Sequence, residues 1–133
     1  MSRLLVLDAS AAMEIVLCRP GAETVLALLA EASWVGAPEL YCSEIANALW
    51  KHVRAGDFSA EDAHGFLRSA LDLVDEFVPA RELVSEAMTA AIAHAHPVYD
   101  AMYAITAVRH GATVCTFDKR LKKLLEAMLI PSL

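Results

Sequence analysis

Hydrophobic and polar positions along the chain alternate between short apolar runs and longer stretches with helical spacing. Residues 4–7 are continuously apolar, which predicts a strand buried on both faces. Comparable runs predict strands at residues 34–36, 73–78 and 113–116, and Ile130 is expected to begin a fifth. The amphipathic stretches between them predict helices over residues 10–19, 22–32, 40–55, 59–72, 79–94, 99–110 and 119–128, with Ser10 as the N-cap of the first.

Strands that alternate with helices indicate an α/β fold of three layers, α/β/α, around a central and mostly parallel sheet of four or five strands. No repeat or linker interrupts the 133 residues, so we expect a single domain. Ligands of such sheets bind at the carboxyl ends of the strands, near a switch in strand order. Asp8 follows the first predicted strand and Asp118 the fourth, so both are expected at the same edge.

Composition narrows the class of protein. Hydrophobic residues make up 57% of the chain, enough for one core, and 11 basic against 17 acidic residues give a net charge of −6. That charge excludes a broadly basic nucleic-acid-binding surface, so any such role needs a local site. The three cysteines, Cys18, Cys42 and Cys115, form no C-x-x-C pair, which favours a reducing cytoplasm. No apolar stretch has the length of a signal peptide's core or of a membrane span.

Four acids stand in otherwise apolar surroundings: Asp8, Glu44, Asp100 and Asp118. For three of them, a purely structural role is the alternative to a role in a functional site. Asp8 could merely end a strand, Asp100 could favour a helix N-terminus, and Asp118 could cap the last helix. Glu44, however, shares a helix face with Asn47 and Lys51, and that face presents a carboxylate, an amide and an ammonium in a column.

Converging carboxylates repel one another, and a cation removes that penalty. Asp100 lies on the same helix face as Ala104 and Ala107, where an unpaired charge is costly to bury, so its expected partner is a cation. Oxygen ligands together with a substrate phosphate suit Mg²⁺ or Mn²⁺ better than zinc. Ser10, Asn47 and Thr116 are candidates for orienting the carboxylates by hydrogen bonds.

At these residues the sequence resembles the PIN-domain family of metal-dependent ribonucleases, and most closely the VapC-type toxins of toxin–antitoxin pairs. The resemblance covers nearly the whole chain, and although each piece alone is weakly specific, four in the right order are strongly so. The matching segments are Asp8-Ala9-Ser10, Glu44-Ile45-Ala46-Asn47, Tyr99-Asp100-Ala101-Met102-Tyr103-Ala104 and Thr116-Phe117-Asp118.

The resemblance implies a PIN-like domain over residues 1–133 and an endoribonuclease that cleaves RNA phosphodiester bonds with one or two Mg²⁺ or Mn²⁺ ions. It places the metal-binding and catalytic acids of the family on Asp8, Glu44, Asp100 and Asp118, with Asp118 the most variable of the four. It places the supporting polar positions on Ser10, Asn47 and Thr116. It also implies a partner, a VapB-type antitoxin whose tail covers the helices near the site and sends an Arg or Lys toward the acids.

Other side chains are candidates for binding RNA or a second copy of the chain. Lys51, Lys119 and Arg120 are expected to contact RNA phosphates, against the alternative of a solvated helix face. His96 is assigned to the turn that it forms with Pro97. The helices over residues 22–32 and from Ser59 carry more apolar surface than one small domain hides, which predicts a homodimer contact.

Two other functions compete with the ribonuclease. In a phosphotransfer or phosphohydrolase domain, Asp8 would be a phosphorylated nucleophile, but no second acid follows two residues later, and Glu44 and Asp100 would be unexplained. A catalytically silent module that binds RNA or protein would have no need for four clustered acids. Metal dependence of RNA cleavage separates these alternatives from the ribonuclease.

Overall fold

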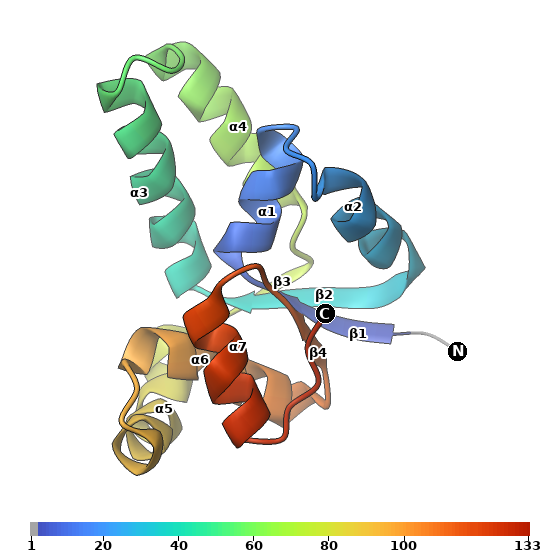
Figure 1. Ribbon diagram of the computed structural model, residues 1–133, viewed down its shortest axis with the longest axis vertical. Helices are drawn as coiled ribbons and strands as arrows, with labels where there is room; N and C mark the ends of the chain where they lie inside the picture. The colour runs from blue at the N-terminus through green and yellow to red at the C-terminus, as the bar shows by residue number, and fades with distance from the viewer. Residues whose placement is uncertain (1–2) are drawn as a thin grey trace.

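The computed structural model describes residues 3–133, in which two helices follow each of the first three strands and one helix follows the fourth (Figure 1). Four strands carry the labels β1 to β4, and they span Arg3–Leu7, Ala32–Pro38, Glu76–Val78 and Thr113–Cys115. The helices α1 to α7 span Ala9–Val16, Ala22–Glu31, Leu40–Arg54, Ala60–Asp72, Ala80–His94, Val98–His110 and Lys119–Ala127.

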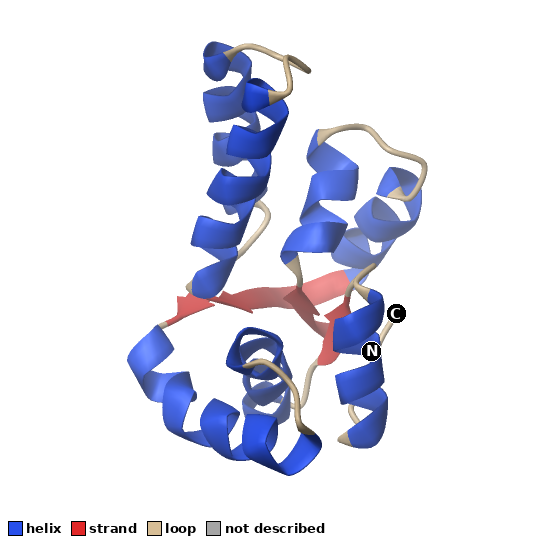
Figure 2. Ribbon diagram, turned by 60° about the vertical axis from the view of Figure 1, so that its left-hand side comes forward, coloured by secondary structure: helices blue, strands red, loops and turns tan. Residues whose placement is uncertain are grey.

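The four strands form one parallel sheet in the order β3-β2-β1-β4. β1 lies inside the sheet, where Leu5 is paired with Val35 of β2 and with Thr113 of β4. Helices α1 to α4 cover one face of the sheet and helices α5 to α7 the other (Figures 1 and 2). The predicted three-layer α/β/α fold with a parallel sheet is therefore confirmed.

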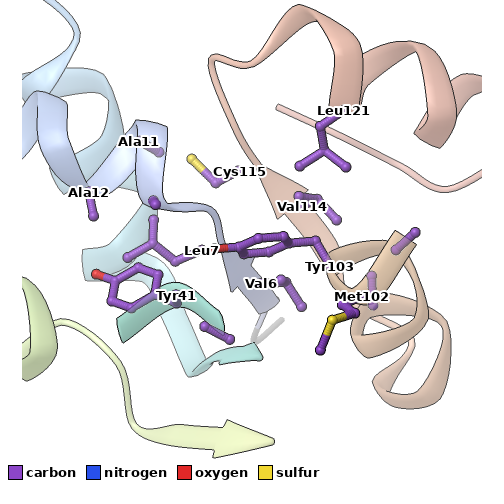
Figure 3. Packing of buried hydrophobic residues seen from close by; sticks show 14 of the residues in the cluster. Val6, Leu7, Ala11, Ala12, Tyr41, Met102, Tyr103, Val114, Cys115 and Leu121 are labelled. Atoms are coloured by element: carbon purple, nitrogen blue, oxygen red, sulfur yellow. The ribbon is translucent and has the colours of Figure 1, made fainter. Parts of the chain in front are cut away.

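The core is densest around β1. Leu5, Val6 and Leu7 are fully buried, as expected of a central strand covered on both faces. Figure 3 shows Val6 and Leu7 among side chains from both helical layers, including Tyr41 of α3 and Tyr103 of α6. This packing fixes the end of β1, which is where Asp8 begins the candidate site.

Several predicted element ends are confirmed by the cap geometry. Ser59 is the N-cap of α4, and its hydroxyl accepts a hydrogen bond of 3.0 Å from the Asp62 amide. Gly111 ends α6 in the left-handed conformation, with φ 61°. The prediction for α1 was wrong at both ends: Asp8, and not Ser10, is its N-cap, and the helix ends at Val16 because Cys18 turns into the left-handed region, with φ 51°.

Three strand predictions needed correction. β2 is longer than predicted, since it runs from Ala32 to Pro38, and β3 is shorter because Leu73 still belongs to the end of α4. The fifth strand reduces to a single parallel bridge between Ser132 and Val114. Pro131 accepts a hydrogen bond from the Val114 amide but has no amide hydrogen to donate, so it cannot continue a ladder.

A stripe of exposed apolar side chains lies on a helix that the sequence analysis did not select. Among large apolar residues that are exposed, α2 contributes only Leu26 and α4 contributes none. Val84, Met88 and Ile92 of α5 are exposed instead, and their four-residue spacing places them on one face of that helix. Within residues 3–133, no helix combines the length and the apolar character needed to cross a bilayer.

Candidate active site

The site begins at the carboxyl ends of β1 and β4, on either side of the switch in strand order. β1 is followed along the chain by β2 on one side, whereas β4 pairs with β1 on the other side. The Asp8 amide donates a hydrogen bond of 3.0 Å to the Cys115 carbonyl, which holds the two strand ends together. Asp8 and Asp118 therefore lie at the same edge of the sheet, as predicted.

Two hydroxyl groups anchor one oxygen of Asp8. Oδ2 accepts hydrogen bonds from the Ser10 hydroxyl at 2.5 Å and the Thr116 hydroxyl at 2.7 Å. These hydroxyl oxygens in turn accept hydrogen bonds from the amides of Phe117 and Asp118, each at 2.9 Å. Since each hydroxyl has a single hydrogen, both hydrogens are committed to Asp8. Its other oxygen, Oδ1, accepts no hydrogen bond from residues 3–133.

Burial shapes the titration of Asp8. The residue is only 6% exposed, and this desolvation raises the pKa of its carboxyl above the usual value. The hydrogen bonds from Ser10 and Thr116 act in the opposite direction, while the charge of Asp118 raises the pKa further. A positive partner would therefore stabilise the ionised form of Asp8.

Glu44 reaches the same edge of the sheet from α3. Its Oε1 accepts a hydrogen bond of 2.6 Å from the hydroxyl of Tyr103, a buried side chain of α6. Burial raises the pKa of Glu44 to about 7, Tyr103 opposes that rise, and the charges of Asp8, Asp100 and Asp118 add to it. Burial and the charges of the three other acids therefore both favour the protonated form of Glu44.

Asp100 and Asp118 each have one oxygen occupied by a neighbour. His96 Nε2 lies 2.9 Å from Asp100 Oδ2, so His96 does more than form the turn to which it was assigned, and it meets the carboxylate where a cation was expected. Asp118 is the N-cap of α7, and its Oδ1 accepts hydrogen bonds from the amides of Arg120 and Leu121. The structural alternative for Asp118 therefore holds, although capping engages only one of its two oxygens.

Two hollows meet beside these acids, and Glu44 and Asn47 line both. The first, here called the acidic hollow, has a volume of about 580 Å³ and is lined by Leu40, Ser43, Glu44, Asn47, Pro97, Tyr99, Asp100, Asp118 and Arg120. The second, the basic hollow, has a volume of about 540 Å³ and is lined by Ser10, Met13, Glu14, Arg19, Glu44, Asn47, Ala48, Lys51, His52 and Phe117. Together they provide an elongated surface on which a polymeric substrate could lie.

The structure distributes the predicted site residues unevenly over this surface. Lys51 and Arg120 line one hollow each, whereas Lys119 is exposed and lines neither. Sequence reasoning missed the contacts of Tyr103, His96 and Arg19 with the site. The spacing from Asp100 signalled two of them, because His96 precedes it by four positions and Tyr103 follows it by three on the same helix.

The donor chemistry fits a hard divalent cation. The free oxygens belong to carboxylates, and Mg²⁺ commonly binds one or two carboxylates while it keeps several waters. Within residues 3–133, no three His, Cys, Asp or Glu side chains are grouped closely enough to hold a metal ion together. The expectation that the four acids converge on one point is therefore not met in this part of the chain. Glu44, Asp100 and Asp118 line one hollow, whereas Asp8 lines neither.

Known proteins resemble this chain over almost its whole length. The profile of the PIN domain matches residues 5–126. Ribonuclease VapC3 of Pyrobaculum aerophilum is 29% identical over 133 residues, which cover 96% of this chain and 98% of the relative.

Three solved structures share the fold. PAE2754 from Pyrobaculum aerophilum has a TM-score of 0.72 at 24% identity, with 97% of this chain and 96% of that chain covered. FitAcB from Neisseria gonorrhoeae has a TM-score of 0.64 at 20% identity, with 96% and 95% covered. VapBC2 from Rickettsia felis, bound to a DNA fragment from their promoter, has a TM-score of 0.62 at 16% identity, with 98% and 97% covered. Since the PIN domain match extends over far more than half of the sequence, the chain belongs to the PIN domain family.

Proposed function

We propose that this protein is an endoribonuclease that uses Mg²⁺ or Mn²⁺ to cleave RNA phosphodiester bonds, and that it is the toxin of a type II toxin–antitoxin pair. The observation that carries the proposal is the set of four carboxylates around one edge of the sheet, with unengaged oxygens on Asp8 and Asp118. Similarity to Ribonuclease VapC3 supports the substrate class. The three cysteines are free thiols, which is compatible with action in the cytoplasm.

In this proposal, Asp8, Glu44, Asp100 and Asp118 hold one or two ions between them, and each ion is bound by no more than two of the four carboxylates. When bound, the ion lowers the pKa of a water and stabilises charge on the leaving oxygen. Ser10 and Thr116 fix the Asp8 carboxylate, and Tyr103 fixes that of Glu44. Because metal would favour the ionised form of Glu44, binding is expected to release a proton near neutral pH. Asn47, Arg120 and Lys51 are proposed to orient the substrate by polar contacts, whereas Lys119, which lines neither hollow, is not.

A VapB-type antitoxin is the proposed protein partner. An apolar hollow of about 250 Å³ lies between α3 and α4, lined by residues that include Leu49, Trp50 and Leu67. It shares α3 with Glu44, so a segment seated there would extend along the helix toward the acids. A basic side chain of that segment would then meet the negative charge of the site.

A homodimer is also proposed, with its contact on the exposed face of α5. Val84, Met88 and Ile92 form the apolar stripe that an isologous contact would cover. Met88→Glu would place charges in such a contact, and it is expected to convert the dimer to a monomer in sedimentation experiments.

The central test is cleavage of a mixed RNA pool by the purified protein, with and without a chelator. Cleavage should stop on chelation and return when Mg²⁺ or Mn²⁺ is added back. Sequencing of the RNA ends would then define the cut sites. Cleavage that persists in the chelator would contradict the metal dependence, and RNA binding without cleavage at any metal level would indicate a silent binding module.

A further inference from the structure

Arg19 is a basic side chain of the groove that the proposed reaction has not used. It lies in the loop between α1 and α2, and it lines the basic hollow together with Lys51 of α3. Its side chain is 42% exposed, so its guanidinium is open to a ligand. The nearest acid, Glu14, is 3.8 Å away and touches only its Nε.

A neutral histidine holds this guanidinium in place. The Arg19 Nη2 lies 3.2 Å from His52 Nε2, and His52 Nδ1 lies 2.7 Å from Asp57 Oδ2. Arginine can only donate, so His52 Nε2 must accept and the ring hydrogen must be on Nδ1, where it is donated to Asp57. This chain of two hydrogen bonds orients Arg19 and leaves most of its five donors unused.

The loop that carries Arg19 is also packed against the catalytic edge. A side chain carbon added at Gly21 would lie 2.6 Å from the Phe117 ring and 2.9 Å from Glu14, so a larger residue there would have to displace one of these side chains. Phe117 stands between Thr116 and Asp118 in the sequence, and its amide is bonded to Ser10. The position of Arg19 is therefore tied to that of the acids.

The distribution of charge in the two hollows indicates which ligand Arg19 could bind. The chain has a net charge of −6, and the acidic hollow repels a polyanion unless metal is bound. Lys51 and Arg19 place positive charge in the adjoining basic hollow, next to Glu44 and Asn47. Arginine in particular offers a planar fork that matches phosphate oxygens.

We propose that Arg19, together with Lys51, binds a backbone phosphate of the RNA in the basic hollow, beside the scissile bond, and that His52 and Asp57 position the Arg19 guanidinium. This subsite rests on the proposed ribonuclease function. It takes a phosphodiester of single-stranded RNA without reading the base, because its contacts are to the backbone alone.

Binding of a fluorescein-labelled single-stranded RNA oligonucleotide, followed by anisotropy in chelator at several salt concentrations, tests the subsite. Arg19→Gln should raise Kd about 5-fold and reduce the slope of log Kd against log salt by about 0.7, the loss of one phosphate contact. Arg81→Gln, an exposed position on α5 outside both hollows, controls for the change in net charge and should leave Kd within about 2-fold of the parent and the salt slope unchanged. Arg19→Lys should restore the salt slope but only part of the affinity.

The positioning role of His52 has a separate readout. His52→Gln should raise KM about 3-fold with little change in kcat, and it should add nothing on the Arg19→Gln background, because both changes remove the same interaction. A further loss in the double variant would overturn the positioning role.

Each outcome of the binding experiment decides the proposal. Equal affinities of Arg19→Gln and Arg81→Gln, in a parent that cleaves RNA, would overturn the subsite and leave the proposed function standing. A parent that binds RNA without cleaving it would refute the nuclease function while the affinity comparison still decides the subsite. A parent that binds no RNA would refute both.

Discussion

The acidic and basic hollows share Glu44 and Asn47, yet they treat charge in different ways. Around the acidic hollow, carboxylates are partly or wholly buried and influence one another, so that the pKa of Glu44 rises to about 7. In the basic hollow, Arg19 is partly exposed and is linked through a neutral histidine to Asp57. A cation would relieve the repulsion in the first arrangement, whereas the second holds its guanidinium in place and leaves most of the donors free for a ligand. From this comparison we expect that the proposed RNA cleavage and the proposed RNA binding can be altered separately.

The largest expected effect is loss of cleavage when one of the four candidate acids is neutralised. Asp8→Asn or Asp100→Asn should reduce RNA cleavage about 1,000-fold, because the proposed metal loses a charged ligand. The fold should persist, and the metal-free protein should not lose stability, since a repelling charge is removed. Cleavage rates at saturating Mg²⁺ and thermal unfolding in chelator provide the measurements. Cleavage by Asp100→Asn at the parental rate would remove Asp100 from the mechanism.

A smaller loss is expected when the support of Asp8 is weakened. Thr116→Val removes the hydroxyl that donates to Asp8 Oδ2, and it should reduce metal affinity and cleavage about 10- to 100-fold. Thr106→Val is the matched control, because Thr106 is equally buried but donates to the Met102 carbonyl within α6. Metal titration by calorimetry distinguishes the two. Equal losses in both variants would show that only packing is involved.

The unfavourable burial of charge on Glu44 should be visible in how the free energy of unfolding of the metal-free protein depends on pH. The folded-state pKa of Glu44, about 7, lies above its usual value of 4.5, so the folded state binds this proton more tightly. Its contribution is fully present below pH 4.5, is lost as the pH rises toward 7, and amounts to about 1 kcal/mol after solvent screening.

Substitutions of Glu44 and of Tyr103, which donates a hydrogen bond to it, test this pH dependence of stability. Glu44→Gln should raise the free energy of unfolding at pH 8 by about 1 kcal/mol, because it removes the charge and keeps an oxygen for Tyr103. Tyr103→Phe should move the loss of stability to higher pH, since its hydroxyl lowers the pKa of Glu44. Denaturant unfolding in chelator from pH 4 to 8 gives both values, and a parental curve for Glu44→Gln would show that Glu44 is not the titrating group.

The smallest expected effect is a difference in RNA affinity between two lysine variants. Lys51→Gln should weaken RNA binding about 3-fold, because Lys51 lines the basic hollow, whereas Lys119→Gln should weaken it less than about 2-fold. Both substitutions remove one positive charge, so each is the control for the other. A larger effect for Lys119 would mean that RNA follows α7 in place of the hollow.

Much of the fold was predictable because local rules decide it. The apolar run at residues 4–7, Ser59 as a cap and Gly111 as a stop each depend on neighbours in the sequence, and all three were predicted correctly. The fifth strand and the full length of β2 depend on pairing between distant segments, which periodicity does not encode. The location of the exposed apolar stripe likewise depends on which helix faces the packed layers cover.

In the candidate site, too, features that local sequence determines could be predicted, whereas those that depend on tertiary packing could not. Asp8 and Asp118 could be placed together because carboxyl ends of parallel strands share an edge. The link between Glu44 and Tyr103 joins residues 59 positions apart on helices that cover opposite faces of the sheet, so only the tertiary fold creates it. Arg19 was not identified because nothing in the local sequence indicates that its loop touches Phe117.

Asp8 ends one element and begins the next, and this restricts how the protein can be redesigned. Its amide bonds to β4, its carbonyl accepts the amides of Ala11 and Ala12, and one side-chain oxygen is fixed by two hydroxyls. A substitution that loses the side-chain oxygen would therefore remove both the N-cap of α1 and the acceptor of the two hydroxyls, so Asn is the replacement expected to keep the junction between β1 and α1. Glu44 lies within a continuous helix, so substitutions there are expected to disturb the backbone less.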